Sequence, residues 1–88
     1  MVEKEVEVIN KLGLHARPCS LIVQTASKFR SKFEIVRDGQ KINGKSILGL
    51  MMLAAEQGAK LKLIADGVDE EYLINDIEKL FINKFNEE

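Results

Sequence analysis

The chain has no tryptophan, one cysteine and one proline in 88 residues. A single cysteine excludes an internal disulfide and is typical of a reducing compartment. No apolar run approaches the roughly 18 residues that a membrane span requires. The first five residues, Met-Val-Glu-Lys-Glu, lack the basic and apolar regions of a signal peptide. We therefore expect a full-length cytoplasmic protein without a membrane partner.

The chain also lacks an excess of either charge, because 13 Lys and Arg stand against 14 Asp and Glu and the net charge is −1. Proteins that bind nucleic acid usually have a basic surplus or stripe, so this balance argues against such a partner. One His and one Cys, without clustered carboxylates, do not form a usual zinc site. We expect no metal and no other cofactor.

The composition, 45% hydrophobic and 31% charged, fits one small domain over residues 1–88. Alternating apolar residues predict strands at 2–9, 33–36, 40–43 and 60–65, and Asp38-Gly39 predicts a hairpin turn. Helical spacing predicts a helix that begins at Ala16 and has Lys28 and Arg30 near its end, and further helices from about 47 to 53 and from 70 to 81. Asp69 is a candidate N-cap of the last helix, and residues 83–88 are expected to be a fraying, charged tail. The order β-α-β-β-α-β-α predicts an α+β fold, with amphipathic helices on one face of an antiparallel sheet.

The stretch Gly13-Leu14-His15-Ala16-Arg17-Pro18 holds both the only His and the only Pro of the chain. Gly13 permits backbone conformations that other residues resist. Pro18 suits the first turn of a helix, where its missing N–H needs no partner. His15 would then lie at a helix N-terminus, among unpaired N–H groups and a partial positive charge.

Such a position suits transfer of an anionic group. Neutral imidazole is a nucleophile near neutral pH, and a phosphoryl group on a ring nitrogen remains reactive. Arg17 supplies a forked donor for phosphate oxygens, and the backbone N–H groups of Ala16 and Arg17 are further candidate donors. Alternatively, His15 is a surface or helix-capping residue without chemistry. Nucleophilic hydrolysis is poorly supported, because no local base accompanies His15.

The hexapeptide resembles the active-site signature of HPr, the histidine-containing phosphocarrier family of the bacterial phosphotransferase system. The likeness extends to Gly44-Lys45-Ser46-Ile47, Gln57-Gly58 and Ala65-Asp66-Gly67. It implies a two-layer open-faced sandwich with strand order 1-4-2-3 and three helices on one face. It further implies a carrier without turnover of its own. His15 would accept a phosphoryl group on Nδ1 from Enzyme I and pass it to IIA proteins for sugar uptake, with Arg17 as counter-ion.

Ser46 directly precedes an apolar run and suits an N-cap position. By resemblance, it is also a site that HPr kinase/phosphorylase phosphorylates in many members of the family. The run itself could be core. The resemblance instead implies an exposed apolar docking patch that consists of Ala16, Ser20, Ile47, Leu48 and Met51. We expect weak, transient complexes of a monomer.

Three alternatives remain at this point. The nitrogen-related paralogue of HPr, which feeds a regulatory IIA protein, is resembled by the segments Leu80-Phe81, Phe85-Asn86-Glu87-Glu88 and Asn10-Lys11-Leu12-Gly13. The Ser46 surface could serve a co-regulator of transcription. The chain could also be an unrelated two-layer module that binds a small ligand or RNA, although the sheet lacks an aromatic platform for bases.

Overall fold

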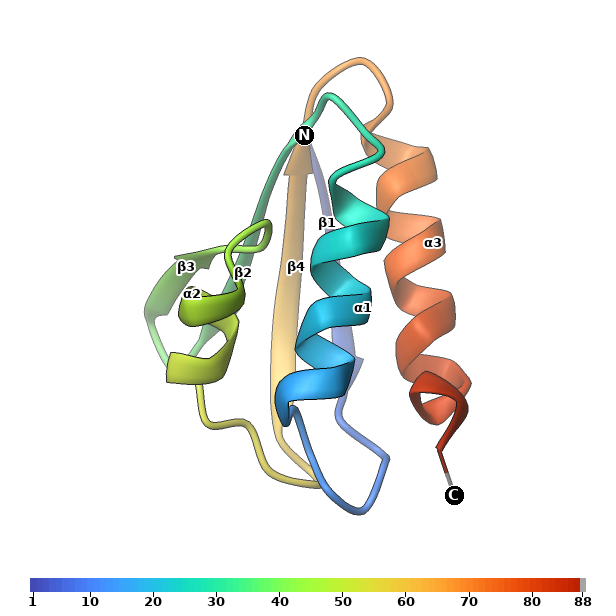
Figure 1. Ribbon diagram of the computed structural model, residues 1–88. Helices are drawn as coiled ribbons and strands as arrows, with labels where there is room; N and C mark the ends of the chain where they lie inside the picture. Colours follow the sequence, from blue (N-terminus) through green and yellow to red (C-terminus); the bar gives the residue numbers. More distant parts are fainter. Residues whose placement is uncertain (88) are drawn as a thin grey trace.

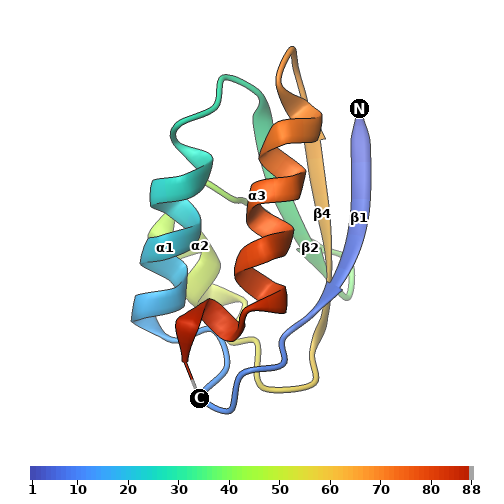
Figure 2. The same cartoon turned by 90° about the vertical axis from the view of Figure 1, so that its right-hand side faces the viewer.

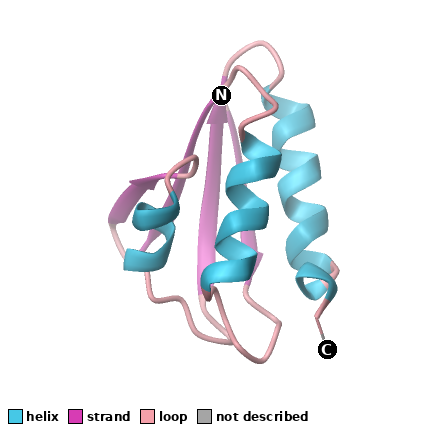
Figure 3. Ribbon diagram, in the orientation of Figure 1, coloured by secondary structure: helices cyan, strands magenta, loops and turns pink. Residues whose placement is uncertain are grey.

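The computed structural model describes residues 1–87 as a four-stranded antiparallel sheet with three helices on one face (Figures 1 and 2). The strands are β1 (Val2–Glu7), β2 (Lys32–Arg37), β3 (Gln40–Asn43) and β4 (Lys60–Asp66). The helices are α1 (Ala16–Ala26), α2 (Ile47–Met52) and α3 (Glu70–Ile82), and a short 3-10 segment, η1 (Lys84–Asn86), follows. The strand order β1-β4-β2-β3 confirms the predicted α+β fold (Figure 3).

The sheet separates a dry face from a wet face by simple alternation. Val6 lies opposite Leu61 in the β1–β4 pair, and both side chains are buried under the helices. The next pair, Glu5 and Lys62, is exposed and places opposite charges on neighbouring strands. Exposed pairs of this kind contribute little to stability, so burial of the apolar face is the main stabilising term.

One core fills the space between the sheet and the helices. α1 and α3 lie side by side over the sheet, and α2 packs against α1 near β3 (Figures 1 and 2). The largest side chains with less than 2% exposure include Ile22, Phe33, Leu63, Leu73, Ile77 and Phe81. Cys19 is fully buried on the inner face of α1, and burial raises the pKa of its thiol. This thiol is therefore part of the packing rather than an exposed nucleophile.

Asp69 occupies the N-cap position of α3, but its side chain does not cap that helix. Its carboxylate instead accepts hydrogen bonds from the backbone N–H groups of Arg30 and Ser31, at 2.9 and 3.0 Å, and from the Ser31 hydroxyl. These bonds lower the pKa of Asp69 to about 2, and the bond from the Ser31 hydroxyl has the largest effect. The residue thus ties the connection between α1 and β2 to the connection between β4 and α3.

The prediction of a fraying tail after residue 82 is wrong for the described residues. Phe85 is 1% exposed, and its ring meets the edge of Phe81 at a centroid distance of 5.0 Å. The reversal that brings Phe85 inward places Lys84, Phe85 and Asn86 at φ values of 53°, 53° and 60°. A left-handed backbone costs a non-glycine residue on the order of 1 kcal/mol. Burial of an aromatic ring, worth about 2–3 kcal/mol, helps to offset that strain.

We expect Phe85→Ala to lower the free energy of unfolding by about 3 kcal/mol, because the change removes a buried ring and leaves a void. Ile82→Ala is the matched control, since Ile82 is 62% exposed one turn earlier, and it should cost less than about 0.5 kcal/mol. Urea unfolding followed by circular dichroism measures both. Equal midpoints for the two variants would contradict the packing role of Phe85.

Candidate functional site

His15 is the N-cap residue of α1, with φ −82° and ψ −171°, as predicted. Its side chain is 36% exposed and makes no hydrogen bond to the first turn of the helix. The backbone N–H groups of Ala16 and Arg17 belong to that first turn, where an α-helix provides no acceptor for them. Pro18 follows, and its ring is buried. The imidazole therefore lies beside a site suited to an anion.

Gly13 sets the direction in which the chain enters α1. Its φ of +69° is left-handed, and an added Cβ would lie 2.6 Å from the Ala55 carbonyl oxygen. The close approach lets the Leu14 N–H donate to that same oxygen at 2.9 Å, while the Leu14 side chain is buried. The residue before His15 is thus fixed to the segment that follows α2. A side chain at position 13 would push the two segments apart.

The carboxylate of Glu87 contacts the candidate nucleophile directly, a feature that the sequence reasoning missed. Its Oε2 lies 2.8 Å from His15 Nε2 and accepts from Arg17 Nη1 at 3.3 Å. Its Oε1 accepts from Asn10 Nδ2 at 3.1 Å. Asn10 is fully buried, and the same Nδ2 donates to the Gly13 carbonyl at 2.8 Å. Figure 2 shows how this is possible, since the segment after α3 lies beside the loop that precedes α1.

Two opposing effects act on the ionisation of Glu87, whose side chain is 16% exposed. Burial raises the pKa of this carboxyl, whereas the hydrogen bonds from Asn10, His15 and Arg17 lower it. The net pKa lies below the ordinary value, so the group is a carboxylate at neutral pH. Phe85, a large apolar residue shortly after Phe81, is a signal that this end of the chain packs against the fold, but no pattern in the sequence marks the contact of Glu87 with His15.

Arg17 lies beside His15, as predicted, and its side chain is 51% exposed. Its guanidinium is turned toward the segment after α3, where Nη1 donates to the Phe85 carbonyl at 2.7 Å. Glu87 therefore binds the Arg17 guanidinium, which the sequence analysis expected to bind a phosphoryl group. The three side chains His15, Arg17 and Glu87 form one hydrogen-bonded group from two distant parts of the chain.

Ser46 is the N-cap of α2, and its hydroxyl accepts from the Gly49 N–H at 3.1 Å. The helix that it begins leaves large apolar side chains in solvent. Leu48 is 75% exposed, and Ile47 and Met51 are 41% and 46% exposed, so they are not core residues. Ala16 is exposed on α1, the helix against which α2 packs, and Ser20 is half-buried there. Exposed apolar surface of this extent is typical of a protein contact.

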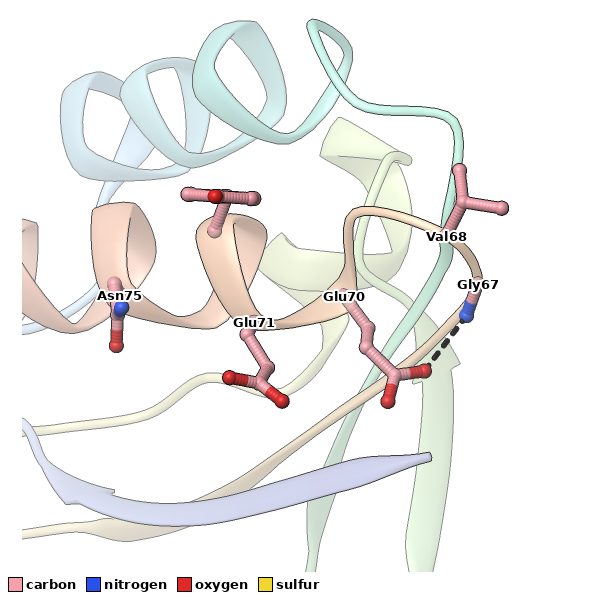
Figure 4. Close-up of a pocket in the computed structure, with 6 residues that line it drawn as sticks. Gly67, Val68, Glu70, Glu71 and Asn75 are labelled. Atoms are coloured by element: carbon pink, nitrogen blue, oxygen red, sulfur yellow. Dashed lines mark hydrogen bonds between the residues drawn. The ribbon is translucent and has the colours of Figure 1, made fainter.

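A hollow near the start of α3 lacks the reactive groups found around His15 (Figure 4). It is lined by Gly67, Val68, Glu70, Glu71, Tyr72 and Asn75. Glu70 accepts from the Gly67 N–H at 3.0 Å, and this bond lowers the pKa of its carboxyl. The lining has no cationic side chain and no nucleophile comparable with His15.

Within residues 1–87, no group of three His, Cys, Asp or Glu side chains is placed to hold a metal ion. In the same part of the chain, every helix is too short or too polar to cross a membrane.

Comparison with known proteins places this chain in a family. The family model described as "PTS HPr component phosphorylation site" matches residues 2–83. The phosphocarrier protein HPr of Treponema pallidum is 52% identical over the full length of both chains. The HPr-like protein Crh of Halalkalibacterium halodurans is 53% identical over 90% of this chain and 99% of its own. A crystal structure of HPr from Thermoanaerobacter tengcongensis matches with a TM-score of 0.96 and 50% identity, over 100% of this chain and 99% of that one.

The close approach at Gly13 gives a direct test of how the loop positions His15. We expect Gly13→Ala to lower the free energy of unfolding by about 2–3 kcal/mol, because strain at positive φ adds to a backbone clash. Gly39→Ala is the matched control, since Gly39 has φ +83° but no atom within 4 Å of an added Cβ. It should cost only about 1 kcal/mol. Chemical denaturation measures both, and equal losses would show that the clash with Ala55 is relieved.

Proposed function

The chain belongs to the HPr family of phosphocarrier proteins, and we propose that it carries a phosphoryl group on His15 between two partner proteins. The observation that supports this most is the half-exposed imidazole of His15 at the N-cap of α1, with Arg17 two residues on. The ring can meet a partner, and the helix N-terminus and guanidinium can balance an anion. The chain acts as a relay without turnover of its own.

In the proposed reaction, the Nδ1 lone pair of His15 attacks the phosphorus atom carried by the donor. The backbone N–H groups of Ala16 and Arg17 bind phosphoryl oxygens, and the Arg17 side chain acts as counter-ion. Its 51% exposure and its single-atom contacts leave it able to turn from the Phe85 carbonyl toward the new charge. The P–N bond stays reactive, and the contacts around the phosphoryl group are electrostatic, so a second protein can remove the group.

We propose that the donor is phospho-Enzyme I and that the acceptors are IIA proteins or domains that serve sugar uptake. The exposed side chains of Ile47, Leu48 and Met51, with Ala16 and Ser20 on α1, form the docking patch. Soft Met side chains adapt to partners of different shape. The nitrogen-related branch of the family is the alternative, with the same chemistry at His15 and a regulatory IIA protein as acceptor.

Because the same patch must meet donor and acceptor in turn, we propose that the carrier acts as a monomer. Residues 1–88 form a single HPr domain in this proposal, and the reaction takes place in the cytoplasm. No cofactor, nucleic acid or membrane is needed for any of its steps.

A second candidate function is regulation through Ser46, which the similarity to Crh favours. Crh of Bacillus subtilis, 51% identical over 81% of this chain, is described as a catabolite repression HPr. A phosphate on Ser46 would add a dianion at the start of α2, beside the docking patch. This charge would repel an acidic partner surface. HPr kinase/phosphorylase would add and remove the phosphate.

Incubation with phosphoenolpyruvate and Enzyme I should add one phosphate that is labile in acid and stable in base. His15→Ala should abolish this labelling, because the ring is the proposed acceptor. Mass spectrometry after each treatment measures the modification, and Glu5→Ala, on the exposed face of β1, is the control for an unrelated change. Equal labelling of His15→Ala and wild type would disprove the carrier role of His15.

Incubation with ATP and HPr kinase/phosphorylase should add a phosphate that is stable in acid, and Ser46→Ala should remove it. Ser27→Ala is the matched control, an exposed hydroxyl at the C-terminal end of α1 and outside the docking patch. Once labelled, the protein should accept phosphate from Enzyme I at least about tenfold more slowly, because like charges now face an acidic partner. Unchanged labelling of Ser46→Ala would exclude this serine as the regulatory site.

A further inference from the structure

We propose that Glu87 is a positioning residue of the carrier: its carboxylate keeps the proton of the neutral His15 ring on Nε2 and so leaves the Nδ1 lone pair free to attack. The inference rests on the proposed phosphocarrier function and explains which nitrogen of the ring reacts. It assigns a role to a residue outside the Gly13–Pro18 motif.

His15 Nε2 lies 2.8 Å from Glu87 Oε2. An ionised carboxylate only accepts hydrogen bonds, so the nitrogen that it contacts must carry the proton. A neutral imidazole has a single N–H, and the other nitrogen is then a bare acceptor. The side chain of His15 makes no hydrogen bond to the first turn of α1, which leaves Nδ1 available there.

The carboxylate is itself held in place at both oxygens. Asn10 Nδ2 fixes Oε1 at 3.1 Å, and Arg17 Nη1 approaches Oε2 at 3.3 Å. Asn10 is fully buried and also donates to the Gly13 carbonyl, so the group is tied to the loop that carries His15. With its side chain only 16% exposed, Glu87 is less screened by water than an ordinary surface carboxylate.

The transfer step is balanced with this proton in place. The Nδ1 lone pair forms the new P–N bond, and the bond between phosphorus and the donor breaks with its electron pair left on the donor. Nε2 keeps its proton throughout, so the phosphorylated ring carries a positive charge that the Glu87 carboxylate balances. When an acceptor attacks phosphorus, the P–N pair returns to Nδ1 and the ring is neutral again.

The first experiment uses the unphosphorylated protein and does not depend on any partner. In ¹⁵N-labelled protein at a pH where the ring is neutral, long-range ¹H–¹⁵N spectra report which ring nitrogen carries hydrogen. Wild type should show Nε2–H alone, and Glu87→Ala should reduce the preference for that tautomer by about tenfold, as expected for loss of a charge-assisted bond. Glu5→Ala removes an exposed carboxylate from β1 and should leave the spectrum unchanged. An unchanged tautomer in Glu87→Ala overturns the proposal.

The second experiment measures the rate of phosphoryl acceptance from phospho-Enzyme I. Glu87→Ala should accept about tenfold more slowly, and sodium formate should restore part of the rate where sodium chloride at equal ionic strength does not. Urea unfolding midpoints of Glu87→Ala and of the control Glu5→Ala verify that both variants are folded. A faster rate in Glu87→Ala would show that the carboxylate repels the cargo and would overturn the proposal. Absence of labelling in wild type would instead refute the proposed function, and the spectra would still decide the role of Glu87.

Discussion

One close backbone approach, between Gly13 and Ala55, supports the whole arrangement of the site. The Leu14 N–H donates to the Ala55 carbonyl at 2.9 Å only because position 13 has no Cβ. That contact fixes the last residue before His15 to the segment that leaves α2, so α1, with His15 at its N-cap, and α2, which carries most of the proposed docking patch, share one anchor. Buried Asn10 adds a second anchor through the Gly13 carbonyl. The candidate site is therefore positioned by rigid backbone rather than by its flexible side chains.

The segment after α3 completes the site at the expense of local strain. Three consecutive non-glycine residues, 84–86, adopt positive φ, each at a cost of about 1 kcal/mol. Burial of Phe85 against Phe81 is one compensation, and the hydrogen bonds that Glu87 accepts are another. Neither compensation exists without the turn, since both residues point back toward the fold only after the reversal. Strain at a functional site is stable when neighbouring contacts over-determine it, and this turn is held from both sides.

Local patterns were enough to predict the fold and part of the site. Alternation of apolar residues located the strands. Asp38-Gly39 forms the predicted hairpin turn with positive φ at both residues, and Ser46 is the predicted N-cap of α2. Long-range side-chain contacts were not predictable in this way. Asp69 accepts hydrogen bonds from Arg30 and Ser31, which precede it by 39 and 38 positions in the sequence. Glu87 contacts His15 across 72 positions. No periodicity encodes such contacts, and a charged residue near a chain end resembles any solvated residue until the turn before it is known.

The balance of charge around His15 suits a group that must be both accepted and released. A helix N-terminus and a guanidinium alone would favour the phosphorylated state and slow its onward transfer. The Glu87 carboxylate opposes that bias, because it competes for Arg17 and adds negative charge near the cargo. In the proposed transfer it also stabilises the cationic ring that results from attack by Nδ1, which favours acceptance. In the proposed relay these two effects act in opposite directions on the phosphorylation equilibrium, while the free lone pair on Nδ1 sets the rate of acceptance. A carrier that binds its phosphoryl group too tightly would not pass it on.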